Sequence, residues 1–438
     1  MKIKFKSCIF ILSCFLMFFL LQLNTQVNAQ QVSWGYEATN MTSFFEKTKD
    51  MSNEEIVVVV IDLGIDPNHS WFKTETGESR IVGGAFCNPQ GCVDETYDDE
   101  VLNYIDDSTL GHGTHVAGII AKSTPDNVKI LPIKVEKDAH GIDHTTMFKA
   151  FIHVLALTIK YNIKVVNYSM EIGTTEMCSG QMALYYYSLA AYPLYLNDIL
   201  IVSAAGNLNT DTKASCLNHY DEVVVVSAMD NQFKKSSISN YGDEVDFAAP
   251  GVGIYSAQRN SGEYAVHPLT GTSQAAPHVS ANIALLYNAC PTCSMKSIED
   301  ILLHSAKDLG DSGKDKYFGH GYIDMEKSYA YLSEKFNNIK VIVQVAGVGT
   351  AKSTASGKSI NGGLITNNSM TFNVTGKDTI IFTPAFLFGV KKFTNGITGE
   401  SKKNLGFKAF AFTISQPTFS EKEQTVSIYV RFSLLNLF

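Results

Sequence analysis

The chain has 438 residues, enough for two or three domains at roughly 150 residues each. Hydrophobic residues make up 45% and charged residues 18%, a balance typical of folded globular proteins rather than disordered chains. The net charge of −8 argues against nucleic acid as the main partner, because phosphate binding needs clustered positive charge. Eight cysteines are too few for a fold held by disulfides alone.

Residues 1–29 have the pattern of a secretory signal peptide. Lysines near the N-terminus precede the apolar run Cys8–Leu21, and Val27-Asn28-Ala29 offers a cleavage site. The run is shorter than the roughly 20 residues that span a bilayer, which disfavours a membrane anchor. Cys14 suggests a lipoprotein, but the apolar run continues past it. We therefore expect a protein that is secreted or held at the cell envelope.

The cysteines after residue 29 are compatible with disulfides in an exported chain. Cys87 and Cys92 flank a turn-like loop and form the easiest pair to close, and Cys178 with Cys216 is a second candidate. Cys290 and Cys293 form a C-x-x-C motif, for which we favour a disulfide over a redox or metal site because no second such motif is present. The connectivity stays open, because six cysteines allow 15 pairings.

Between residues 30 and 336, short β-branched runs alternate with helical stretches. Runs that are apolar on both faces are typical of a parallel sheet covered by helices on each side. We expect helices over Thr145–Tyr161 and Gln181–Tyr192, with Pro193 ending the second. This pattern predicts one α/β domain, with strands expected at 56–61, 128–135, 164–167, 199–202 and 223–226.

From residue 337 to residue 438 the composition changes. Thr, Ser, Asn, Gly and Phe dominate, and short alternating runs at 369–374, 378–383 and 425–432 predict a small all-β C-terminal module. Residues 30–340 are strongly acidic, whereas the residues after them are basic. An anionic surface, nucleic acid or the cell envelope is therefore open as a partner only for this tail.

Motifs in the order Asp, His, Asn and Ser carry the chemistry. Asp62 ends a buried strand, His112 lies in Gly-His-Gly-Thr-His, Asn207 follows Ala-Ala-Gly, and Ser273 lies in Gly-Thr-Ser-Gln-Ala-Ala-Pro-His. A serine hydroxyl needs a base to become a nucleophile, and a buried carboxylate can orient a histidine for that task. A side-chain amide and the N-terminus of a helix can stabilise an oxyanion.

These motifs, with Ser239–Gly251 and 318–324, resemble the subtilisin family of serine endopeptidases over about residues 31–332. The resemblance implies a subtilisin-like α/β fold and a secreted serine endopeptidase that cleaves peptide bonds of proteins or peptides through an acyl-enzyme. It makes Ser273 the nucleophile, His112 the general base and acid, Asp62 its orienting carboxylate and Asn207 an oxyanion donor. It also implies substrate binding along the residues Ser169, Met170, Glu171 and Gly206.

Other histidines offer competing roles. His112-x-x-His115 could be a metal pair, but no Glu follows His112 as in a zincin, so we place His115 in helix packing. His278 follows Pro277 in an apolar helix and is interpreted as a core histidine. We expect no required cofactor. A structural calcium ion is doubtful, because the segment Ala121–Ile130 is shorter than the calcium loop of many subtilases.

The sequence departs from the family at three further places. The inhibitory propeptide usual in the family is missing before the strand at Ile56. Glu171 stands where Gly is common, and is either a solvent-facing carboxylate or a specificity residue that favours basic side chains. The run Asp94–Glu100 is either a solvated loop, a calcium site or an attractant for basic substrates.

Two other classes of function compete with an active peptidase. The first is a binding protein whose peptidase domain has lost activity, which the intact Asp62, His112, Asn207 and Ser273 argue against. The second is a surface-attached protein located by its β module, but a module of this size is too small for a closed autotransporter barrel.

Overall fold

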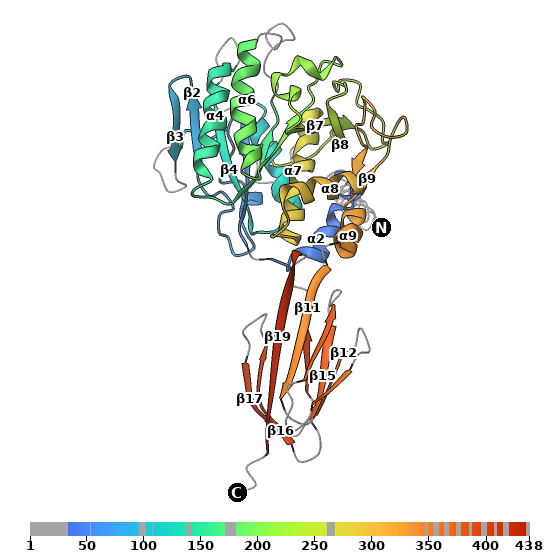
Figure 1. Cartoon of the computed structure of the whole chain (residues 1–438). Coiled ribbons are helices and arrows are strands. Elements are labelled where there is room, and N and C mark those ends of the chain that lie inside the picture. Colours follow the sequence, from blue (N-terminus) through green and yellow to red (C-terminus); the bar gives the residue numbers. More distant parts are fainter. Residues whose placement is uncertain are drawn as a thin grey trace, which may run out of the picture. The chain divides into compact units, whose positions relative to one another are not determined.

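The computed structural model describes residues 34–335 except 53, 96–101, 107, 137–141, 171–180 and 261–267, and the backbone of strands between 337 and 434 (Figure 1). The described chain divides into two compact units. The first contains Glu55–Leu285 and Leu302–Glu326 together with the chain up to Lys47. The second contains Thr48–Glu54, Leu286–Ile301 and Lys327–Phe438.

The first unit is built on a 10-stranded sheet in the order β3-β2-β4-β1-β5-β6-β7-β8-β10-β9. Neighbouring strands from β2 to β10 in this order run parallel, and β3 and β9 add antiparallel edges. The bounds are β1 Ile56–Asp62, β2 Gly84–Asn88, β3 Gly91–Glu95, β4 Val128–Val135, β5 Ile163–Tyr168, β6 Leu200–Ala204, β7 Val223–Met229, β8 Val245–Pro250, β9 Ala306–Lys307 and β10 Tyr322–Ile323.

Strand β1 shows why the apolar runs form the centre of this sheet. All of its residues are buried, so both faces of the strand are covered. Val57, Val59 and Ile61 join the core that contains side chains of α4 (His144–Leu157) and α6 (Gln181–Leu196). The alternate side chains point to the other face, where α3 (His112–Ser123) packs against β1 and β4. The predicted parallel sheet with helices on both sides is confirmed.

Helices α4 and α6 lie side by side over the sheet (Figure 1). The prediction that Pro193 ends the second helix is wrong, because α6 continues through Pro193 to Leu196. Leu194 is fully buried, and packing of the last turn offsets the single backbone hydrogen bond that a proline removes. Helix α4 begins at His144, capped by the Asp143 side chain, and ends at Leu157, four residues before the predicted end.

Further α-helices are α2 Met41–Thr48, α7 Thr272–Ala289, α8 Met295–Ser305 and α9 Met325–Lys335. Helix α7 runs through the buried segment that carries Ala275 and Ala276. These small side chains allow the helix to pack closely.

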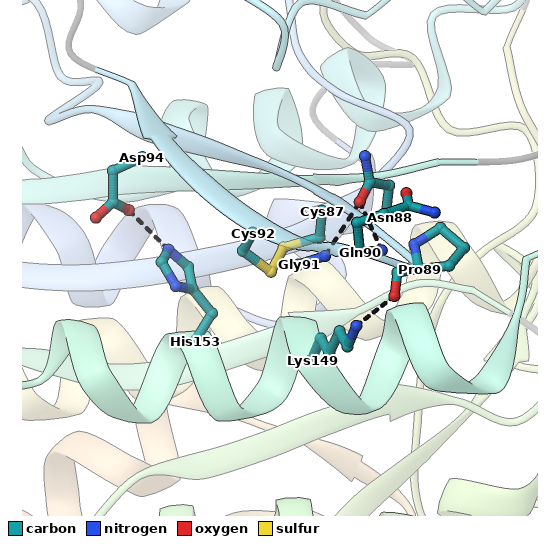
Figure 2. Close-up of a disulfide and its surroundings, with 9 residues drawn as sticks. All are labelled: Cys87, Asn88, Pro89, Gln90, Gly91, Cys92, Asp94, Lys149 and His153. Carbon is teal, nitrogen blue, oxygen red and sulfur yellow. Dashed lines mark hydrogen bonds and ion pairs between the residues drawn. A yellow bond between two sulfur atoms is a disulfide. The ribbon is translucent and has the colours of Figure 1, made fainter.

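The antiparallel hairpin β2–β3 at the edge of the sheet is closed by the Cys87–Cys92 disulfide, as predicted. Figure 2 shows its attachment to α4, where Lys149 Nζ donates to the carbonyl of Pro89. One turn further along the helix, His153 Nε2 lies 2.7 Å from an Asp94 carboxylate oxygen. The hairpin is therefore closed by a covalent bond and held to a helix by polar contacts.

The second unit contains the Cys290–Cys293 disulfide, which confirms the disulfide interpretation of that motif. Its later strands form a 5-stranded sheet, β14-β11-β19-β16-β17, and a 4-stranded sheet, β13-β12-β15-β18. The predicted domain boundaries and a separate all-β module stay predictions. The strand bounds are β11 Asn337–Ala346, β12 Gly349–Ser353, β13 Ser359–Gly362, β14 Asn368–Asn373, β15 Asp378–Pro384, β16 Phe388–Asn395, β17 Ser401–Gly406, β18 Phe410–Ile414 and β19 Ser420–Leu434.

Candidate active site

The site residues gather at the carboxyl ends of three neighbouring parallel strands. Asp62 is the last residue of β1, Ser169 follows β5, and Asn207 lies shortly after β6. Because β5 lies between β1 and β6, Ser169 lies between the other two along this edge. Ligand sites of open α/β sheets are found at such an edge.

Asp62 and His112 form a close pair. His112 Nδ1 lies 2.9 Å and 3.0 Å from the two carboxylate oxygens of Asp62. Asp62 is 1% exposed and also accepts a hydrogen bond of 2.7 Å from the backbone N–H of Leu63. The His112 side chain is 25% exposed, so the ring has one end on a buried carboxylate while part of it reaches solvent.

Two glycines allow this approach of α3 to β1. A Cβ on Gly113 would lie 2.0 Å from the carbonyl oxygen of Gly64 and 3.1 Å from Asp62 Cβ. Gly64 itself has a φ of 98°, in the left-handed region that favours glycine. Only residues without a side chain fit here, and the first turn of α3 can therefore lie against the end of β1.

Ser273 lies in the first turn of α7, where it donates a hydrogen bond to Ser169 and accepts one from it. Its Oγ donates to the carbonyl of Ser169 at 2.9 Å, and Ser169 Oγ donates to the carbonyl of Ser273 at 2.9 Å. Asn167 Nδ2 in turn donates to Ser169 Oγ. The helix N-terminus that carries Ser273 is thus held to the end of β5, next to the end of β1.

Asn207 lies beside the same helix N-terminus. Its Oδ1 accepts hydrogen bonds from Thr272 N at 2.8 Å and from Thr272 Oγ1 at 3.2 Å. The Thr272 hydroxyl also accepts from the backbone N–H of Gly206. These bonds fix which way the Asn207 amide faces, and leave Nδ2 as its donor end. Asn240 Oδ1 holds the following loop by accepting from Leu208 N and Thr210 N.

His115 and His278 are buried, as the packing interpretation requires. His115 Nε2 lies 2.9 Å from the carbonyl of Ile254, and His278 Nδ1 lies 2.8 Å from that of Gln274. Burial lowers the pKa of His115 from 6.5 to about 3 and the pKa of His278 to about 4. Both rings are neutral at ordinary pH, and neither pairs with Asp62 in the described contacts.

The structure describes three of the four residues that are expected to bind substrate. Met170 packs against the core that contains side chains of α4 and α6. The side chain of Ser169 is buried and hydrogen-bonded to Ser273 and Asn167. Gly206 has a φ of 103° immediately before Asn207. Glu171 lies outside the described residues, and so does Cys178, the predicted partner of Cys216; both expectations stay predictions.

A cavity of about 580 Å³ is lined by Leu63 and Ser108, which are hydrogen-bonded to Asp62 and His112, but neither Asp62 nor His112 is among its described lining residues. The backbone N–H of Leu63 donates to Asp62, and the Ser108 hydroxyl accepts from the backbone N–H of His112. Its described lining residues are Leu63, Phe86, Asn103, Ser108, Thr109, Lys134, Val135 and Glu136.

Two buried carboxylates near this site are not predicted from the sequence. Glu95 was assigned to an acidic loop but ends β3, where it accepts from Asn103 N, Asn103 Nδ2 and Tyr104 N. The solvated-loop interpretation is thus wrong for Glu95, because three donors compensate its burial; residues 96–101 lie outside the described part. Asp106, also buried, contacts the first turn of α3. The pattern Asp-x-Ser at 106–108, typical of turns and caps, was an available signal.

Within the described residues, no group of three or more His, Cys, Asp or Glu side chains could hold a metal ion. The cofactor and calcium expectations stay predictions. A helix long and apolar enough to cross a membrane is also not found in the part of the chain that the structure describes.

Comparison with known proteins decides the family. A model described as "Subtilase family" matches residues 53–321, more than half of the chain. The chain belongs to the subtilase family. Subtilisin DY of Bacillus licheniformis is 30% identical over 282 residues, 62% of this subtilase and 89% of that protein. The minor extracellular protease Epr of Bacillus subtilis (strain 168) is 31% identical over 278 residues, 62% of this subtilase and 38% of that protein.

The solved structures agree on the fold. The crystal structure of a lanthipeptide protease matches with a TM-score of 0.56 and 23% identity, over 69% of this subtilase and 95% of that chain. The predicted subtilisin-like α/β fold is confirmed, and so is the predicted class of enzyme. This subtilase is a serine endopeptidase that acts on proteins or peptides.

Proposed function

We propose that this subtilase cleaves peptide bonds with Ser273 as nucleophile, His112 as general base and acid, and Asp62 as the carboxylate that orients His112. In acylation, Ser273 Oγ attacks the substrate carbonyl while its proton passes to His112 Nε2. His112 then gives the proton to the leaving amine, and water repeats the sequence to release the acyl group. Asp62 stabilises the imidazolium that forms between these transfers.

The observation that carries the proposal is the Asp62–His112 pair, with 2.9 Å between Nδ1 and Oδ1 and a carboxylate that is almost fully buried. A carboxylate on Nδ1 selects the tautomer whose Nε2 can accept a proton. Ser273 is bonded to Ser169, which follows the strand next to β1, so the nucleophile and the base share one edge of the sheet.

The oxyanion of the tetrahedral intermediate would be bound by Asn207 Nδ2 and the backbone N–H of Ser273. Thr272 donates two hydrogen bonds to Asn207 Oδ1, so the Asn207 amide is already oriented before negative charge develops on the substrate oxygen. Donors that need no reorientation contribute most to this kind of stabilisation. The first turn of α7 adds the positive end of its dipole.

Labelling with a fluorophosphonate probe tests the nucleophile. We expect the folded wild-type protein to be labelled once, and Ser273→Ala to lose labelling and peptidase activity. Ser297→Ala, on α8, is the matched control and should be labelled like the wild type. Equal labelling of folded Ser273→Ala would overturn the proposal.

We further propose that the protein is exported and that residues 1–29 are removed. The Cys87–Cys92 and Cys290–Cys293 disulfides support an oxidising compartment. N-terminal sequencing of protein from the culture medium should begin near Gln30; intact Met1 on the active protein would contradict it.

For Glu171, the proposed preference for basic side chains would be lost in Glu171→Ala on a peptide library.

A further inference from the structure

The buried carboxylate Asp106 is tied to the first turn of the helix that carries His112. Asp106 is 0% exposed. Its Oδ1 accepts from Ser108 N at 3.0 Å and from Ser108 Oγ at 2.5 Å. Its Oδ2 accepts from Thr114 Oγ1 at 2.8 Å and from Thr114 N at 3.3 Å. Ser108 Oγ also accepts from the backbone N–H of His112 at 3.3 Å.

These bonds replace a missing helix cap. The residue at the N-cap of α3 is Gly111, with a φ of 64° and no side chain to accept a hydrogen bond. A helix leaves its first backbone N–H groups without intrahelical partners. Ser108 accepts from the first of them, His112, and Asp106 accepts from the third, Thr114. A carboxylate at this end of a helix is also favoured by the helix dipole.

The other side of the network is fastened to the end of β1. Ile65 N donates to the carbonyl of Tyr104 at 3.1 Å, and Asp106 N donates to the carbonyl of Ile65 at 2.9 Å. Asp66 N donates to Thr114 Oγ1 at 3.0 Å, so the Thr114 hydroxyl accepts from this segment and donates to Asp106. The segment Ile65–Asp66 is joined to Asp62 through Leu63 and Gly64 alone. Both members of the Asp62–His112 pair are therefore attached to one hydrogen-bonded frame.

We propose that Asp106 is a positioning residue for catalysis, which sets the place of His112 relative to Asp62 through Ser108 and Thr114. The inference rests on the proposed role of His112 as general base. In Asp106→Asn, an NH₂ group would replace one of the two carboxylate oxygens. This NH₂ group cannot accept the hydrogen bonds that either Ser108 or Thr114 donates to that oxygen. Either the Ser108 or the Thr114 bonds would be lost, and the first turn of α3 could shift.

The test measures kcat and KM of Asp106→Asn on a peptide substrate, with active sites counted by the fluorophosphonate probe. We expect kcat to fall by up to about 10²-fold, as for a displacement near 1 Å, with KM within about threefold of the wild-type value. Thr114→Ser keeps the hydroxyl and should keep kcat, whereas Thr114→Val should lower it. If Asp106→Asn does not fold, this Thr114 pair carries the test.

Asp143→Asn is the matched control, because Asp143 caps α4 by accepting from Thr145 N and Thr146 N. It should change thermal stability only slightly, because Asn caps a helix about as well as Asp, and it should leave kcat unchanged. An equal loss of kcat in Asp143→Asn, or a kcat within twofold of wild type in folded Asp106→Asn and Thr114→Val, overturns the inference. Full activity of His112→Ala would instead overturn the proposed function.

Discussion

Replacement of Gly113 by Ala should separate the Asp62–His112 pair. The new Cβ would lie 2.0 Å from the Gly64 carbonyl oxygen, whereas real Cβ contacts are essentially never under 3.0 Å. The first turn of α3 and the end of β1 must therefore move apart by about 1 Å, because both atoms in conflict are close to rigid backbone. Added to the 2.9 Å between His112 Nδ1 and Asp62 Oδ1, such a shift exceeds hydrogen-bond range.

We expect Gly113→Ala to lower kcat by about 10²-fold and the free energy of unfolding by about 1–3 kcal/mol. Kinetics on a peptide substrate and denaturant unfolding measure the two effects. Gly118→Ala is the matched control on the same helix, since its Cβ would lie 2.5 Å from Ser256 Oγ and 2.6 Å from Ala257 Cβ. It should lose stability with a much smaller change in kcat.

The reasoning would be refuted by a folded Gly113→Ala enzyme whose kcat stays within threefold of wild type. An equal loss of kcat in Gly118→Ala would show that overpacking anywhere in α3 has this effect, and that the Asp62 contact is not special.

Three further predictions follow from the described contacts. Asn207→Ala should lower kcat by about 10²–10³ with little change in KM, since this is the usual cost of losing one oxyanion donor; an unchanged kcat contradicts that role. Burial holds the pKa of His115 at about 3 and of His278 at about 4. Below pH 6.5 the unfolded chain binds protons that the folded chain does not, so the free energy of unfolding should fall steadily as the pH is lowered from 6.5 to about 4. Urea unfolding at pH 7, 5 and 4 checks this, and a constant midpoint would refute it. Replacing both Cys87 and Cys92 by Ala should destabilise the protein by about 2 kcal/mol, as expected for opening a short loop, and guanidinium unfolding would show it; no change contradicts the estimate.

The strands could be predicted from the sequence because their signal is continuous. Val57–Ile61 is apolar and β-branched at every position, and a run this short and this composition favour a strand covered on both faces. The end of α6 could not, because a local rule about Pro193 competed with the burial of Leu194 against residues far away in the sequence. Packing decided the result, and packing is not visible in a local pattern.

The site was predicted at the level of its motifs but not of its supports. Asp62 and His112 stand in recognisable local sequences, and the structure brings them together. Glu95 and Asp106 lie in an acidic segment whose composition predicts exposure to solvent, yet both are buried against backbone donors. Whether a carboxylate is solvated depends on the donors that the fold brings to it, and these come from other parts of the chain.

The two-way bond between Ser169 and Ser273 has a consequence for inhibitor design. In this structure the hydroxyl hydrogen of Ser273 points to the Ser169 carbonyl, and an attack on an electrophile requires it to turn toward a base. A peptidyl inhibitor that also contacts the backbone of Ser169 would act on the partner of the bond and on the serine at once. Extending an electrophilic inhibitor so that it contacts Ser169 should therefore increase its rate of covalent reaction as well as its affinity.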